Sequence, residues 1–171
     1  MRIKHWILTV GILLSTPFWA EAQDFAYVDT QYVLEQIPEY GQAQREIDRL
    51  SLQWTGEVEA LLSEADALQQ SFDAERILLT DEMQEERLAV IQAKKDEARN
   101  LRIRYFGPQG ELFKKRSELV KPIQDQVYNA VRAVARSERL DFIFDKNGSA
   151  TMLFANDDYD VSDKVLDELG Y

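Results

Sequence analysis

The chain has 171 residues and a formal net charge of −11 at neutral pH, because its 31 acidic residues outnumber 20 basic ones. This acidity argues against nucleic acid as a partner, since phosphate binding needs clustered positive charge. The chain has no cysteine, and its one histidine is His5 in the N-terminal segment. From Gln23 onward it therefore lacks the residues of Ser–His–Asp and Cys–His catalysis and of most zinc sites, and disulfide bonds cannot stabilise it.

Residues 1–22 have the pattern of a secretory signal peptide. A basic start at Arg2 and Lys4 precedes an apolar stretch, 6–19, that is shorter than the about 20 residues of a membrane-crossing helix. Ala20-Glu21-Ala22 then offers a small-residue cleavage site. We expect cleavage after Ala22, export from the cytoplasm and no stable membrane insertion of the remaining chain. An uncleaved membrane anchor is the alternative.

Residues 25–29 predict a short β-strand, because large and small side chains alternate there. Asp29 or Thr30 can cap a brief helix that extends through Ile37. Pro38 ends that helix, because proline disfavours helical geometry in the residue before it, and it suits the first turn of the next helix.

The next helix is expected over about 39–79 and carries an apolar stripe with steps of three and four residues. Such spacing keeps one side of a helix against a partner helix, as in a coiled coil. Two interpretations remain open: the stripe packs between two helices of an arm, or some of its side chains contact bound polypeptides. The stripe comprises Tyr40, Ala43, Ile47, Leu50, Trp54, Val58, Leu61, Ala65, Leu68 and Phe72. The candidates for the arm seam or for partner contact are Ile47, Leu50, Trp54, Val58, Leu61, Leu68 and Phe72.

The long helix is predicted to turn back at a hairpin tip near 78–81. Thr80 has the character of an N-cap, and the two acidic residues after it favour the dipole of a new helix. The descending helix is expected over 81–106 and ends at the interruption Gly107-Pro108-Gln109-Gly110. Together these helices predict an antiparallel coiled-coil arm over about 39–110.

A further helix is predicted from about Glu111, in which Pro122 should introduce a bend or mark a new start. A strand over 141–145 follows. Lys146-Asn147-Gly148 then predicts a tight turn, because Asn-Gly readily accepts positive φ. The chain is expected to return as a partner strand over 150–155.

The C-terminal segment has two interpretations. Part of it matches the oxygen-ligand spacing of a calcium-binding EF-hand loop, at Asn156, Asp158, Asp160 and Asp167. Val161, however, occupies the position where that loop needs glycine. We therefore expect a polar loop leading into a helix over 163–169, capped by Ser162 and closed by Gly170, and we expect no metal or cofactor.

The predicted fold class is mainly α with a small β body. Residues 23–38 and about 111–171 are expected to form this body within a single domain over 23–171, from which the arm projects. Three short strands with apolar faces are too small to be stable alone, so we expect self-association through the body. The side chains that it would bury are Phe25, Tyr27, Phe142, Phe144, Met152 and Phe154.

The chain contains, in order, Phe25-Ala-Tyr-Val-Asp29, Tyr105-Phe-Gly-Pro-Gln-Gly-Glu-Leu-Phe113, Val120-Lys-Pro-Ile-Gln-Asp-Gln-Val-Tyr128 and Leu140-Asp-Phe-Ile-Phe-Asp145. In these stretches, and in its charged coiled-coil insertion, it resembles the Skp/OmpH family of periplasmic chaperones. The resemblance implies a jellyfish-like homotrimer whose arms enclose a cavity, and ATP-independent binding of unfolded outer-membrane β-barrel proteins. Several family members are basic whereas this chain is acidic, so no lipopolysaccharide-binding residues are carried over.

Two functions are therefore carried forward. The resemblance implies a holdase that prevents the aggregation of outer-membrane proteins during their transport to the outer membrane. The alternative is a structural coiled-coil protein, such as an envelope spacer or an adaptor, with one fixed folded partner. An exported enzyme is not expected, because the chain after Ala22 has neither histidine nor cysteine and no glycine-rich phosphate loop.

Overall fold

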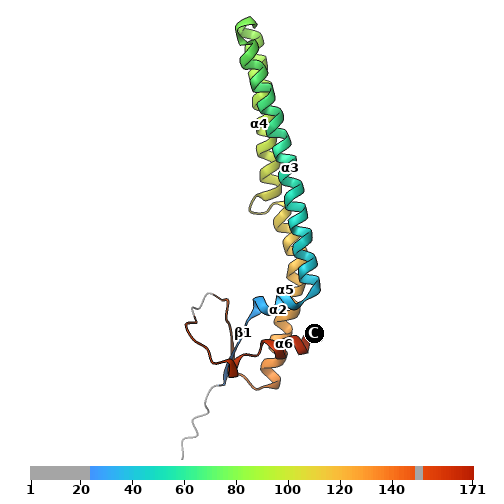
Figure 1. Ribbon diagram of the computed structural model, residues 1–171, viewed down its shortest axis with the longest axis vertical. Coiled ribbons are helices and arrows are strands. Elements are labelled where there is room, and N and C mark those ends of the chain that lie inside the picture. Colours follow the sequence, from blue (N-terminus) through green and yellow to red (C-terminus); the bar gives the residue numbers. More distant parts are fainter. Residues whose placement is uncertain (1–23, 149–151) are drawn as a thin grey trace, which may run out of the picture.

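The computed structural model describes residues 24–148 and 152–171 as a long rod that rises from a small body (Figure 1). The expected signal peptide lies outside the described residues, as do positions 149–151 of the expected C-terminal hairpin. The first strand and the last helix belong to the body, whereas the middle of the chain forms the rod.

Strand β1 (Phe25–Val28) leads directly into helix α2 (Thr30–Gln36). Asp29 is the N-cap of α2, and its carboxylate accepts a hydrogen bond of 2.9 Å from the Tyr32 N–H. This bond satisfies one of the backbone donors that the first turn of a helix leaves without a partner. The expected short helix before Pro38 is therefore confirmed.

Helix α3 (Pro38–Glu75) and helix α4 (Asp81–Phe106) form the distal part of the rod, joined at its tip by the short 3-10 turn η1 (Arg76–Leu78). Pro38 occupies the start of α3, where its missing N–H costs no helical hydrogen bond. Thr80 caps α4 as expected, because its hydroxyl accepts a backbone N–H at 3.4 Å. The helical hairpin and its tip are thus confirmed.

Helix α5 (Glu111–Ser137) continues the returning side of the rod below α4 and packs against the lower part of α3 (Figure 1). Pro122 lies inside this single helix, so the alternative of a new helical start there is wrong. An apolar face on α5 offsets the hydrogen bond that proline cannot donate. The buried residues of this face are Val120, Ile123, Val127, Ala130 and Val134.

Strand β2 (Phe142–Asp145) lies parallel to β1 in a two-stranded sheet. The register places Phe25 opposite Phe142 and Tyr27 opposite Phe144. Parallel neighbours need a crossover connection, and the connection between these two strands is the whole rod.

The expected partner strand over 150–155 is wrong for its described residues, because 152–155 are not in a strand. A turn does form, centred on Lys146 and Asn147 and closed by a hydrogen bond of 3.1 Å from the Gly148 N–H to the Asp145 carbonyl, but neither Asn147 nor Gly148 has the positive φ of a two-residue hairpin turn. The chain therefore leaves the sheet after β2. Among the described residues, the chain next pairs with β1 at an isolated parallel bridge between Tyr27 and Asp160.

Helix α6 (Ser162–Leu169) closes the body. Ser162 is its first residue and not its N-cap, which corrects the expected start. Its hydroxyl is engaged elsewhere, accepting the Asp29 N–H at 2.8 Å and donating to Asp160 Oδ1 at 2.5 Å. Gly170 ends the helix with a φ of 89°, as expected for a left-handed C-cap.

The body core lies where β1, α2 and α6 meet the base of the rod. Val33 and Val165 are fully buried at its centre, and the cluster of buried side chains extends up the rod to Ile47 on α3 and Val120 on α5. The predicted fold class, mainly α with a small β body and a long helical-hairpin arm, is confirmed.

Candidate interaction surfaces

The seven arm-seam candidates from the sequence all lie in the rod and are buried or half-buried. The buried ones are Ile47, Val58 and Phe72, and the half-buried ones are Leu50, Trp54, Leu61 and Leu68. On the returning helix α4, Ile91 and Ala98 are buried as well. This placement supports the interpretation of a seam between helices over direct contact with a bound polypeptide.

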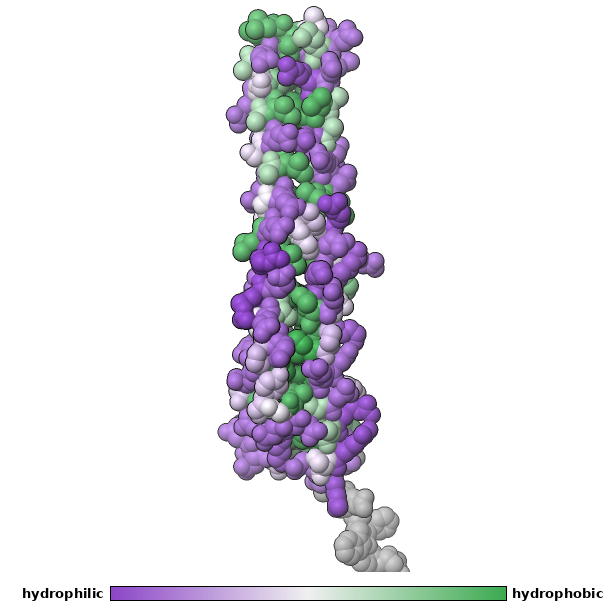
Figure 2. Space-filling model, turned by 90° about the vertical axis from the view of Figure 1, so that its right-hand side faces the viewer, coloured by the Kyte–Doolittle hydropathy of each residue, from purple (hydrophilic) through white to green (hydrophobic). Residues whose placement is uncertain are grey.

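A different set of apolar side chains, the exposed arm residues, faces solvent along the rod. At the tip, Ile77 and Leu78 are 92% and 81% exposed. Figure 2 shows hydrophobic side chains as separate patches along one side of the rod, divided by hydrophilic ones. The other members of this set are Leu52, Met83, Leu88, Val90, Ile103, Phe106 and Phe113. Of this set, Leu52 lies within the span of the stripe but off its three-and-four spacing.

Ion pairs connect α3 to α4 on the rod surface. Lys94 Nζ lies 3.3 Å from a Glu64 carboxylate oxygen across the rod and 3.0 Å from one of Glu97 on its own helix. Its hydrogen bonds, first to Glu97 and then to Glu64, raise the pKa of Lys94. Exposed pairs of this kind contribute only about 0–1 kcal/mol each. The seam therefore dominates the pairing of the helices.

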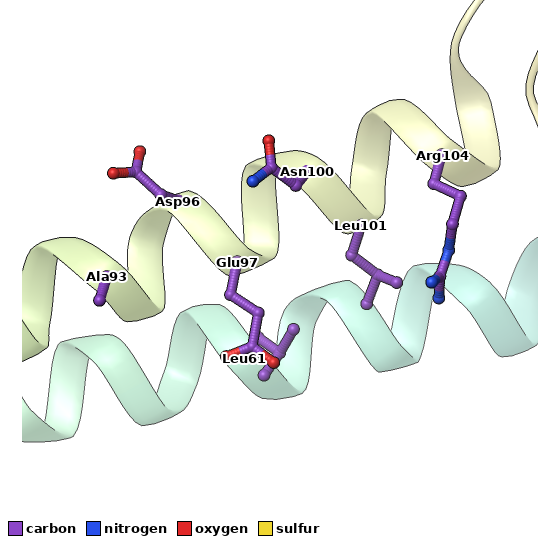
Figure 3. A pocket seen from close by; sticks show the side chains of 7 residues that line it. All are labelled: Leu61, Ala93, Asp96, Glu97, Asn100, Leu101 and Arg104. Atoms are coloured by element: carbon purple, nitrogen blue, oxygen red, sulfur yellow. The ribbon is translucent and has the colours of Figure 1, made fainter.

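A groove of about 480 Å³ lies along the junction of α3 and α4 (Figure 3). Leu61 lines it from α3, and Glu97, Leu101 and Arg104 extend toward α3 from α4. The groove thus combines apolar side chains with the carboxylates of Asp96 and Glu97 and the guanidinium of Arg104. Leu61 is a seam candidate that also borders a surface depression.

An aromatic cluster joins the two sides of the rod where α4 ends. The rings of Trp54 and Tyr105 are stacked, with centroids 4.7 Å apart and planes inclined by 7°. The Tyr105 hydroxyl donates to Glu57 Oε2 at 2.5 Å, and this hydrogen bond holds the pKa of Glu57 below its usual value. The Arg104 guanidinium lies 5.0 Å from the Tyr105 ring centroid. We call these four residues the waist cluster.

The outer face of the sheet is a second apolar surface. Phe25, Tyr27, Phe142 and Phe144 share this face, because paired residues of a sheet point to the same side. The three phenylalanines are 54%, 52% and 48% exposed in chain order, whereas Tyr27 is only 4% exposed. Sequence reasoning did not include Tyr159, which stacks on Phe25 with ring centroids 5.8 Å apart.

The remaining body candidates lie beside this face. Met152 is half-buried and Phe154 is 86% exposed, and both line an apolar hollow of about 310 Å³ against the sheet. In the part of the chain that the structure describes, β2 has a strand neighbour on one side only. An open strand edge next to exposed aromatic side chains favours association with another polypeptide.

The residues with calcium-ligand spacing form local hydrogen bonds or lie in a helix. Asn156 caps the 3-10 turn η2 (Asp157–Tyr159), accepting the Asp158 N–H at 3.3 Å. Asp160 accepts a hydrogen bond from the first residue of α6, and Asp167 lies within that helix. Within 24–148 and 152–171, no group of three or more His, Cys, Asp or Glu side chains is placed to hold a metal ion.

Comparison with known proteins identifies the family. A family profile described as "Outer membrane protein (OmpH-like)" matches residues 24–169, almost the whole described chain. The chain belongs to the OmpH-like family. The resemblance inferred from the sequence motifs is thereby confirmed.

Two relatives of this OmpH-like chain extend the comparison. A candidate OmpH-like outer membrane chaperone from Caulobacter crescentus CB15 has a crystal structure that matches with a TM-score of 0.65 and 15% sequence identity, over 86% of this chain and 84% of that one. A protein of unassigned function from Aquifex aeolicus (strain VF5) is 27% identical over 146 residues, 85% of either chain. The structural match shows that the rod and body are the OmpH-like fold.

Membership of the OmpH-like family assigns the chain to a family of chaperones. Among the described helices, none is long and apolar enough to cross a membrane. The surfaces available to a partner are the exposed arm residues, the groove between α3 and α4, and the outer face of the sheet.

Proposed function

We propose that this OmpH-like chain is an ATP-independent periplasmic holdase that binds unfolded outer-membrane β-barrel proteins and prevents their aggregation on the way to the outer membrane. The observation that carries the proposal is the family match over residues 24–169, on a fold whose rod presents apolar side chains to solvent. The N-terminal sequence pattern supports export, with cleavage after Ala22.

The geometry of the rod supports binding of extended, unstructured chains. Outer-membrane strands alternate apolar and polar residues and carry aromatic girdles, so an unfolded barrel protein offers many short apolar contacts. The exposed arm residues are spread along the rod up to its tip, and hydrophilic side chains separate the apolar patches (Figure 2). Weak contacts at several such points add up through multivalency, and each one stays easy to release.

The body supports self-association, and we propose the homotrimer that the family resemblance implies. Its two-stranded sheet is too small to shield both of its faces, and the outer face leaves three phenylalanines half-exposed. Association of bodies through this face would bury Phe25, Phe142 and Phe144 together with Phe154. Rods fixed to one shared body would then border a common space.

The test is suppression of aggregation by the purified chain that begins at Gln23. A urea-denatured outer-membrane barrel protein is diluted into buffer without nucleotide, and light scattering is followed with increasing amounts of the chain. We expect suppression near stoichiometric amounts, unchanged by added ATP. Unchanged scattering at several-fold molar excess would overturn the proposal, and capture of one stoichiometric folded partner would favour a structural spacer or adaptor.

A further inference from the structure

The turn after β2 carries a chemically reactive pair, Asn147 followed by Gly148. An asparagine side chain can react with the backbone nitrogen of the next residue, and glycine permits this best because it has no Cβ to hinder the approach. Both residues are exposed, so water reaches the reacting atoms. The other asparagines of the chain, Asn100, Asn129 and Asn156, precede leucine, alanine and aspartate. From the sequence, Asn147 is therefore the asparagine most prone to lose its amide.

The structure holds this pair in a restrained geometry. The Asn147 side-chain Nδ2 donates to Asp29 Oδ1 at 2.6 Å, and the Asn147 backbone N–H donates to Asp145 Oδ1 at 3.1 Å. The Gly148 N–H donates to the Asp145 carbonyl at 3.1 Å. Hydrogen bonds thus engage both the amide that would leave and the nitrogen that would attack. Reaction requires the Gly148 nitrogen to leave the Asp145 carbonyl and approach the Asn147 side chain.

Further hydrogen bonds tie the same turn to the start of helix α2. The Thr30 hydroxyl lies 2.9 Å from each carboxylate oxygen of Asp145. Asp29, which holds the Asn147 amide, is the N-cap of α2. The start of α2 and the turn after β2 therefore share one hydrogen-bond network, in which the Asn147 amide is a donor. Any reaction that replaces this amide alters the network.

We propose that Asn147 is a modification site that undergoes slow deamidation and that Asp29 restrains this reaction in the folded chain. The Gly148 nitrogen, having released its proton to water, attacks Cγ of Asn147 and forms a five-membered succinimide ring. The Cγ–Nδ2 bond breaks, and Nδ2 takes up a proton from water and leaves as ammonia. A second water molecule then opens the ring, to aspartate or to isoaspartate, whose main chain passes through Cγ. The net reaction consumes water and releases ammonia.

The product alters the body where β2 meets α2. A carboxylate replaces the amide donor opposite Asp29 and beside Asp145, and neighbouring carboxylates disfavour each other's ionised form. Lys146 Nζ, 3.5 Å from Asp29 Oδ2, offsets part of this repulsion. Isoaspartate also adds a main-chain atom to the turn. Conversion therefore releases the turn from α2, so that an aged chain has a looser body.

Peptide mapping by mass spectrometry tests the site directly. The purified chain that begins at Gln23 is incubated for a long period at neutral pH, folded and, in parallel, in guanidinium chloride. The deamidated fraction is followed at each asparagine, and chromatography separates the aspartate from the isoaspartate product. In the folded chain we expect both products at Asn147 and more conversion there than at Asn129. Conversion of Asn147 should be faster in guanidinium chloride, because the restraining hydrogen bonds are absent.

Two variants separate the restraint by Asp29 from a general loss of stability. Asp29→Ala removes the acceptor of the Asn147 amide together with a helix cap, and it should speed the conversion of Asn147 several-fold in the folded chain. Thr80→Ala is the matched control, because it removes the N-cap of α4 at the far end of the rod. It should leave the rate at Asn147 unchanged.

The consequence for the body is tested with Asn147→Asp, which imitates the aspartate product. This variant should have a lower melting temperature by circular dichroism than Asn129→Asp, the same change at an exposed position of α5. Combining Asn147→Asp with Asp29→Asn exchanges the amide and the carboxylate across the same hydrogen bond. The double variant should recover most of the lost melting temperature, because asparagine also caps helices well.

No more conversion at Asn147 than at Asn129 in the folded chain, or equal rates at Asn147 in Asp29→Ala and Thr80→Ala, would overturn the proposal. If Asp29→Ala loses its helical circular dichroism, the unchanged chain decides, and equal rates with and without guanidinium chloride refute the restraint. Equal melting temperatures of Asn147→Asp and Asn129→Asp refute the effect on the body. No client takes part in these measurements, so their outcome and that of the aggregation test are independent.

Discussion

Asp29 connects two parts of the body through a single carboxylate. It caps α2 by accepting the Tyr32 N–H, accepts a hydrogen bond of 2.6 Å from Asn147 Nδ2, and lies 3.5 Å from Lys146 Nζ. The backbone hydrogen bond from Tyr32 is the largest cause that lowers the pKa of Asp29. The start of α2 is thereby tied to the turn that follows β2.

Asp29→Ala should lower the free energy of unfolding by about 1 kcal/mol at neutral pH, as for the loss of other helix N-caps. Because the pKa of Asp29 is lower in the folded than in the unfolded chain, its ionised form stabilises the fold above the ordinary carboxyl range. That stabilisation is lost as the pH falls through the folded pKa. In urea unfolding, the difference in the free energy of unfolding between Asp29→Ala and the unchanged chain should therefore become smaller in acid. Asp66→Ala, on the exposed side of α3, should show no such pH-dependent difference. A difference in the free energy of unfolding that becomes larger in acid would contradict this role of Asp29.

At the scale of the elements, most of the fold could be predicted from local sequence signals. Pro38, Thr80 and Gly170 each act on the few residues beside them, so the ends of α3, α4 and α6 follow from short stretches of sequence. The apolar stripe likewise predicted the long helix α3, because helical periodicity is also local.

The remaining features depend on residues that are far apart in the chain. The expected hairpin at Asn147-Gly148 is wrong for its described residues, because β2 pairs with β1 and the described chain after it next pairs with the sheet at Asp160. Ser162 was expected as a cap, but its hydroxyl bonds to the Asp29 backbone, 133 positions away. The exposed arm residues could not be assigned from the sequence either, because the periodicity that marks a seam does not say what an off-seam apolar side chain contacts.

The loop between α4 and α5 should tolerate no side chain at Gly110. A Cβ there would lie 2.6 Å from the Tyr105 carbonyl oxygen and 2.8 Å from that of Arg104. Both are backbone atoms, which cannot move aside as the end of a flexible side chain can. Gly110→Ala should therefore lower the melting temperature measured by circular dichroism. Gly56→Ala is the natural comparison, since its Cβ enters open space and alanine stabilises a helix interior by about 1 kcal/mol over glycine. Equal changes of the melting temperature, in the same direction, in Gly110→Ala and Gly56→Ala would contradict this distinction.

For the whole molecule, we propose that the outer face of the sheet is the surface through which subunits associate. Phe144→Asp places a carboxylate on this face, where burial against a second subunit without a partner would cost several kcal/mol. We expect monomers or aggregates by size-exclusion chromatography with light scattering. Phe113→Asp, at a similarly exposed phenylalanine on the rod, should leave the mass of the assembly unchanged. A normal trimer in Phe144→Asp would show that another surface joins the subunits.

The parallel pairing of β1 and β2 has a consequence for the order of events during biogenesis. Their contacts join Asp24 to Asp141, a separation of 117 positions, so an open chain would close a very long loop to make them. If the helical hairpin of the rod forms first, it brings β1 and β2 close together and removes most of that entropic barrier. A chain that emerges amino-end first would thus keep its first strand unpaired until residues 142–145 emerge.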